Sequence, residues 1–108
     1  MPSPTPRPVT RALASLGESL RGWRVLQGLT VAQVADRAGI SERTVKRLEA
    51  GEGAALEHAL RVARALGVLD ELVASVDPLR SDVGRLRAEE LLPRRVRPSR
   101  PGSRAGES

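Results

Sequence analysis

The side chains best suited to binding chemistry are three basic residues that lie close together in segment 41–50. Arg43, Lys46 and Arg47 fall there, and Lys46 is the only lysine among the 18 basic residues of the chain. A guanidinium can bind a pair of planar acceptors with two parallel hydrogen bonds, whereas an ammonium group acts as a compact point charge. The cluster therefore indicates recognition of an anionic or acceptor-rich ligand through hydrogen bonds and ion pairs.

The sequence contains no set of residues for covalent or metal chemistry. His58 is the only histidine and the chain has no cysteine, which excludes a thiolate nucleophile, a disulfide framework and a thiolate metal site. Paired His, Asp or Glu at metal-ligand spacing and a Gly-rich phosphate loop are also missing from the sequence. We therefore expect a protein that is not an enzyme and uses no cofactor or metal, and His58 is assigned no role.

Apolar residues recur at steps of three and four, which predicts that helices position the basic cluster. Segment 12–27 has one such face, on which we expect Trp23 to pack in the core, with Thr10 or Ser15 as the helix cap. No stretch alternates with period two, so we expect no strand and an all-α fold. Further helices are predicted in the following segments: 31–38, 42–50, 56–66, 70–76 and 82–92.

Proline and charge divide the chain into four parts. We expect a disordered Pro-rich arm at 1–11, a folded domain at 12–76, a helical extension at 77–92 and a disordered basic tail at 93–108. The net charge of +5 lies in the ends, because residues 12–92 sum to −1. No apolar run approaches the roughly 18 residues that span a bilayer, and we expect a cytoplasmic protein with no membrane contact.

Segment 31–50, VAQVADRAGISERTVKRLEA, predicts two short helices joined by a tight turn at Gly39. Ala35 is small where two such helices would cross, and Ser41 can cap the second helix. From Leu16 to Val68 the chain resembles the Cro/repressor-type (Xre-type) helix-turn-helix domain. The matching landmarks are Arg24, Gly28-Leu29-Thr30, Val34-Ala35, Gly39-Ile40-Ser41, Thr44-Val45, Arg47-Leu48-Glu49 and Gly51.

The resemblance implies a five-helix repressor-like bundle whose third helix enters the major groove of double-stranded DNA. It also implies a structural ion pair between Arg24 and Glu49. Val45 and Leu48 are expected to face inward, which leaves the polar residues of this helix for base edges and phosphates. The residues expected to contact DNA are Thr30, Gln33, Ser41, Glu42, Arg43, Thr44, Lys46 and Arg47.

One position departs from the family pattern, which often has Gln at the first residue of the second helix. Val31 stands there, which leaves altered specificity, weaker binding or a domain used mainly for protein contact as alternatives. A degenerate domain that no longer binds DNA is a further alternative. The resemblance implies a homodimer formed through the fourth and fifth helices. Apolar residues there have a spacing that suits either the core or the dimer surface, namely Leu69, Leu72, Val73 and Val76.

Two functions are compatible with these features. The first is a transcriptional regulator, a repressor, in which basic residues of the arm and tail add phosphate contacts. The second is a HipB-like antitoxin that binds and neutralises a partner toxin and regulates its own operon. The basic residues of the arm and tail are Arg7, Arg11, Arg94, Arg95, Arg97, Arg100 and Arg104.

Overall fold

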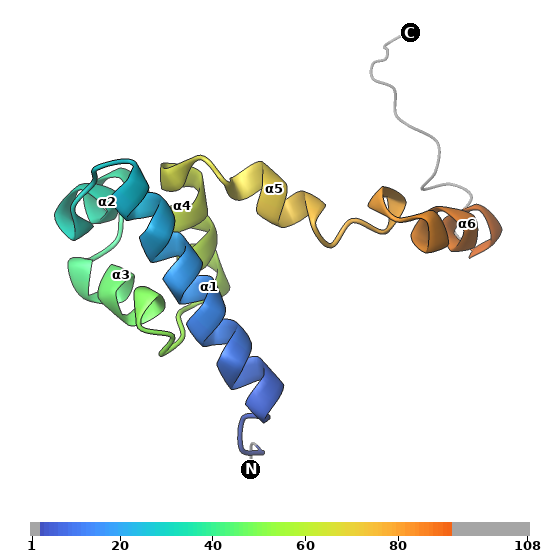
Figure 1. The fold of residues 1–108 in the computed structure, drawn as a ribbon, viewed down its shortest axis with the longest axis horizontal. Coiled ribbons are helices and arrows are strands. Elements are labelled where there is room, and N and C mark those ends of the chain that lie inside the picture. The colour runs from blue at the N-terminus through green and yellow to red at the C-terminus, as the bar shows by residue number, and fades with distance from the viewer. Residues whose placement is uncertain (1–2, 92–108) are drawn as a thin grey trace, which may run out of the picture. The chain divides into compact units, whose positions relative to one another are not determined.

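The computed structural model describes residues 3–91, and the described part divides into two units after Asp70. All regular elements within residues 3–91 are helical, which confirms the predicted all-α fold. No helix in this range is long and apolar enough to cross a membrane. The helices are α1 (Arg7–Leu26), α2 (Val31–Ala38), α3 (Glu42–Glu49), α4 (Leu56–Leu66), α5 (Leu69–Ala74) and α6 (Asp82–Leu91), with a 3-10 turn η1 at Pro78–Arg80 (Figure 1).

Helix α1 begins within the segment expected to be a disordered arm. Pro6 is its N-cap and Pro8 lies in its first turn, so residues 7–11 are helical. Proline is tolerated there because the N–H groups of the first turn have no acceptor within the helix. Neither Thr10 nor Ser15 caps the helix, and the Thr10 hydroxyl instead donates to the carbonyl of Pro6 over 3.4 Å.

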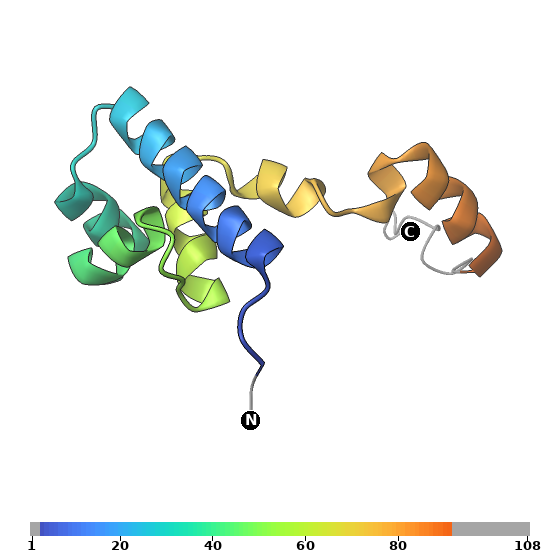
Figure 2. The same ribbon diagram turned by 60° about the horizontal axis from the view of Figure 1, so that its bottom comes forward.

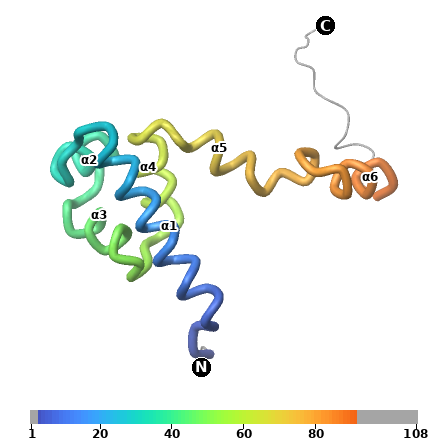
Figure 3. Tube along the Cα trace, in the orientation of Figure 1, coloured from blue at the N-terminus to red at the C-terminus, as the bar shows by residue number. Residues whose placement is uncertain are grey.

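Helices α2 and α3 both begin at a side-chain cap. Thr30 Oγ1 accepts from the N–H of Gln33 at 3.0 Å, and Gln33 Oε1 accepts from the N–H of Thr30 at 2.9 Å, which forms a capping box. Gly39 ends α2 with φ of 72°, a left-handed conformation that glycine adopts without strain. The chain then turns directly into α3, as the tube in Figure 3 shows.

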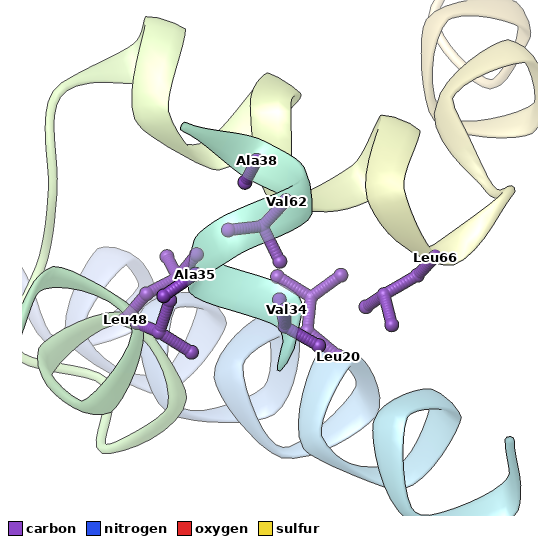
Figure 4. Close-up of a cluster of buried hydrophobic side chains, with 8 residues drawn as sticks. Leu20, Val34, Ala35, Ala38, Leu48, Val62 and Leu66 are labelled. Carbon is purple, nitrogen blue, oxygen red and sulfur yellow. The ribbon is translucent and has the colours of Figure 1, made fainter. Parts of the chain in front are cut away.

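The core of the first unit is built from α1 to α4, which lie side by side in Figures 1 and 2. Val34, Val45 and Val62 are fully buried, one each from α2, α3 and α4. Figure 4 shows most of the buried cluster, which consists of Leu20, Val34, Ala35, Ala38, Val45, Leu48, Val62 and Leu66. Aliphatic side chains of moderate size therefore fill the space between the helices.

Trp23 does not pack in this core, contrary to the prediction from periodicity. Its side chain is 46% exposed, and Leu26 on the next turn is 79% exposed. Trp23 lies three residues after the buried Leu20, which places it about 60° around the helix axis. Aliphatic side chains already occupy the buried positions beside α1, so the indole lies on the rim.

Helices α1 and α3 approach each other at backbone distance. Gly17 is buried, and a Cβ atom there would lie 2.7 Å from the carbonyl oxygen of Glu49 and still closer to that of Leu48. After α3, Gly51 has φ of 77°, and a Cβ on it would lie 2.8 Å from the Cα of Ala14. Glycine at both positions is what allows the end of α3 to rest directly on α1.

The second unit contains few buried groups among its described residues. Asp77 and Ser81 accept from the backbone N–H groups of Leu79 and Gly84, at 2.9 and 2.8 Å, and so shape η1 and the start of α6. Ala88 is its buried hydrophobic residue. Its exposed large apolar side chains are Val73, Val76, Val83, Leu86 and Leu91. The basic tail expected at 93–108 lies outside the described residues.

Candidate nucleic-acid interface

Helix α3 has one buried face and one exposed charged face. Val45 and Leu48 are 0% and 4% exposed, because they pack into the core. The side chains of Arg43, Lys46 and Arg47 are exposed. This division follows from the 3.6-residue helical repeat, which places positions 45 and 48 on the opposite side from position 43. The three basic residues thus share a surface that a ligand can approach.

The cap residues of α2 and α3 are exposed, but their polar groups already have local partners. Ser41 Oγ accepts from the N–H of Thr44 at 3.1 Å, and the two hydroxyl oxygens lie 2.9 Å apart. In the capping box of α2, the carbonyl oxygen of Gln33 is engaged, so its NH₂ group is the part that can contact a ligand. These cap contacts therefore define the starts of α2 and α3, whether or not the same residues also bind a ligand. The residues are Thr30, Gln33, Ser41 and Thr44.

An ion pair joins the end of α1 to the end of α3. Arg24 Nε and Nη2 donate to the two carboxylate oxygens of Glu49 over 2.7 and 3.0 Å. Arg24 Nη1 also donates to the carbonyl of Leu29, ahead of α2, over 3.0 Å. The side chains of Arg24 and Glu49 are only 13% and 8% exposed. This one guanidinium therefore ties together three segments that determine the orientation of α3.

The hydrogen bonds from Arg24 to Glu49 raise the pKa of Arg24 above its already high ordinary value. The stabilisation from this charge is therefore present throughout neutral pH and is lost only in strongly alkaline solution, as the pH rises through the raised pKa. Because Arg24 compensates Glu49, the charges left on the exposed side of α3 are three basic residues against the carboxylate of Glu42. The exposed surface of α3 is accordingly positive.

A hollow lies beside α3 on the side of α4. Arg43, Thr44 and Arg47 line it from α3, segment 52–55 lines it from the connection, and His58 lines it from the first turn of α4. Sequence reasoning assigned His58 no role, because helical periodicity shows only that it lies on α4. It lines the same hollow as two arginines of α3, and no spacing pattern in the sequence reveals this arrangement.

The acidic residues and the histidine of the described part of the chain are not gathered into a metal site. No group of three or more His, Cys, Asp or Glu residues within residues 3–91 is arranged to hold a metal ion. A second hollow, between α2 and α4, is crossed by Arg61, which donates to the carbonyl of Ala38 over 3.2 Å and to Glu57 over 3.0 Å. The guanidinium of Arg61 thus joins α4 to the end of α2.

Comparison with known protein families gives one result. The model of the helix-turn-helix family matches residues 20–71, nearly half of the chain, from the middle of α1 into α5. Neither a search of curated proteins nor a search of solved structures finds a match. The matched range includes α2, the turn at Gly39 and α3, together with both members of the Arg24–Glu49 ion pair.

Proposed function

We propose that the protein is a repressor that binds operator DNA as a dimer. The match of residues 20–71 to the helix-turn-helix family supports an Xre-type (Cro/repressor-like) DNA-binding regulator, and the proposal proceeds from that premise. The observation that carries the proposal is the exposed positive face of α3, held in place by its buried residues and by the Arg24–Glu49 ion pair. A helix of this width fits the major groove of B-form DNA.

Arg43 is the residue we propose for reading a base edge. It lies in the first turn of α3, the part of a recognition helix that contacts bases, and it can bind guanine O6 and N7 with two hydrogen bonds. Lys46 and Arg47 lie one turn later and bind bases or phosphates. Glu42, in the first turn, complements the helix dipole and can accept a hydrogen bond from cytosine.

The starts of the two helices are proposed to position the protein on the DNA backbone. Thr30 and Ser41 lie at helix N-termini, where exposed amide groups favour a phosphate oxygen. Gln33 and Thr44 each lie three residues later and present the remaining polar atoms of the capping pairs. These contacts set the register of α3 without reading sequence themselves.

Dimerisation is proposed to use the apolar residues of α5 and the segment after it. Val73 and Val76 are 57% and 82% exposed, whereas Leu69 and Leu72 are half-buried. Burying these valines against a second copy would remove apolar surface from water, which favours association. Two-fold symmetry would place the two α3 helices about 34 Å apart, one turn of DNA, on a pseudo-palindromic site.

A mobility-shift assay on the protein's own promoter tests the proposal. We expect the wild type to bind, and Arg43→Ala to lose about 1–3 kcal/mol together with discrimination at one base pair. Arg64→Ala is the matched control, because Arg64 is exposed on α4 and is not part of the α3 surface. If about six phosphates are neutralised per dimer, log K should fall against log salt with a slope near −5.

The result that contradicts DNA binding is the absence of any shift by the wild type at low salt, on either the promoter or random duplexes. That result would favour the degenerate domain suggested by Val31. Binding of equal strength by the wild type and Arg43→Ala would instead show that Arg43 does not contact the base. A repressor further requires that promoter occupancy lowers transcription, which a reporter gene measures.

A second function, that of an antitoxin, is favoured by the second unit. Apolar side chains of α6 are exposed beyond the range matched by the family, namely Val83, Leu86 and Leu91. Such a surface suits a partner protein. A kinase-like toxin gene adjacent to this one, and a complex between the two purified proteins, are the expected findings. An isolated locus would count against this function.

A further inference from the structure

The hollow beside α3 is lined by more positive than negative side chains. Arg43 and Arg47 line it from α3, Glu52 lies on the connection, and His58 lies on α4. No residue of α1 or α2 lines it among those the structure describes. Arginine keeps its charge at all accessible pH, so the hollow carries one net positive charge when His58 is neutral and two when it is protonated.

His58 is half-buried, whereas Arg43 and Arg47 are exposed. On its own helix the nearest charged residues are Glu57 and, one turn on, Arg61, and these two pair with each other over 3.0 Å. The carboxylate of Glu57 is therefore already compensated. A protonated imidazole is repelled by two guanidinium groups that line the same hollow. An anion that enters the hollow compensates these charges and so favours the protonated imidazole.

We propose that this hollow holds a phosphodiester of the DNA backbone, with Arg47 and His58 as donors, and that protonation of His58 strengthens DNA binding. The inference rests on the proposed DNA-binding function. The hollow adjoins the positive face of α3 and shares Arg43 and Arg47 with it. A phosphate there would lie beside the groove that α3 enters. DNA affinity should then rise as the pH falls.

The composition of the chain makes this pH dependence easy to assign. His58 is the only histidine, and histidine is the side chain whose ordinary titration falls between about pH 5 and pH 8. The backbone contact is independent of base sequence, so a mixed-sequence duplex is a sufficient probe. The experiment measures the affinity of the full chain for this duplex by fluorescence anisotropy, between about pH 8 and about pH 5.5.

For the wild type we expect affinity to increase about tenfold on acidification, with the slope of log K against log salt steeper by about 0.9 per subunit. His58→Gln keeps a hydrogen-bond donor but cannot gain a proton, so its affinity should stay level over this range. The N-terminal amine titrates identically in both proteins and cancels from the comparison. Circular dichroism at each pH checks that both proteins are folded.

A charge effect of the whole protein is separated from a local contact by moving the histidine. Ser19 is exposed on the flank of α1 opposite to the one that contacts α3. Ser19→His in the His58→Gln background adds a titratable group far from the hollow, and we expect it not to restore the pH dependence. Restoration would overturn the proposal, because any histidine would then suffice.

Two other outcomes also overturn the inference. One is a wild type whose affinity does not change with pH, and the other is an equal pH response in His58→Gln. Both leave the proposed function intact, since DNA is still bound in each case. The absence of binding by the wild type at every pH and at low salt would refute the proposed function itself and the inference with it.

Discussion

Replacing Gly17 by alanine tests whether α3 is held in place by direct contact with the backbone of α1. The added Cβ would lie 2.7 Å from the carbonyl oxygen of Glu49 and closer to that of Leu48. Both obstacles are backbone atoms, so no side-chain rotation relieves the overlap and the two helices must separate. Overpacking of this kind costs about 3 kcal/mol. The gain in helix propensity returns about 1 kcal/mol, which leaves a net loss of about 2 kcal/mol.

Gly22 provides the matched control on the same helix. A Cβ atom there has no heavy atom within 4 Å, so Gly22→Ala should raise the free energy of unfolding by about 1 kcal/mol. The two variants should differ by about 3 kcal/mol, or roughly 10–20 °C in Tm, in thermal unfolding followed by circular dichroism. A Gly17→Ala protein as stable as Gly22→Ala would refute the close contact. We also expect Gly17→Ala to weaken DNA binding, because separation of the helices disturbs the Arg24–Glu49 ion pair.

Three further predictions concern the supports of α3 and the second unit. Glu49→Ala leaves the guanidinium of Arg24 nearly buried without its carboxylate, and should lower the free energy of unfolding by about 3 kcal/mol in urea titrations, whereas an unchanged midpoint would contradict this role. Ser41→Ala removes the cap of α3 and should cost about 1 kcal/mol by the same measurement; a loss below a few tenths would show that the cap is not needed. Val76→Asp should shift the protein toward monomer in analytical ultracentrifugation, and an unchanged sedimentation coefficient would exclude Val76 from the dimer contact.

Local sequence signals predicted the elements around the interface. The step of three and four residues identified the helices, and Ser41 marked the start of α3, where the structure shows it as a side-chain cap. Gly39 marked the end of α2. These features depend on residues within one or two turns of each other, so a single sequence contains the information needed to predict them.

Features that depend on the approach of distant segments could not be predicted in this way. The sequence shows that Trp23 occupies an apolar position of its helix. It does not show that aliphatic side chains from other helices fill the space beside α1 and leave the indole exposed. No sequence pattern distinguishes Gly17 from other residues of its helix, because the backbone carbonyls that lie against it belong to α3. His58 likewise gained a proposed role only through its position beside Arg43 and Arg47.

The start of α2 shows how local structure limits the chemistry that this surface can use. Val31 is half-buried and packs against the core, so it strengthens the attachment of α2 while giving up the polar contact that glutamine often makes in the family. Gln33 does not replace that contact in full, because its carbonyl oxygen is held by the N–H of Thr30. By our proposal, DNA binding then depends on the charged side chains of α3 and on the hollow at His58. Since phosphate contacts depend on salt and carry no sequence information, affinity should depend strongly on ionic strength, and base discrimination should rest chiefly on Arg43.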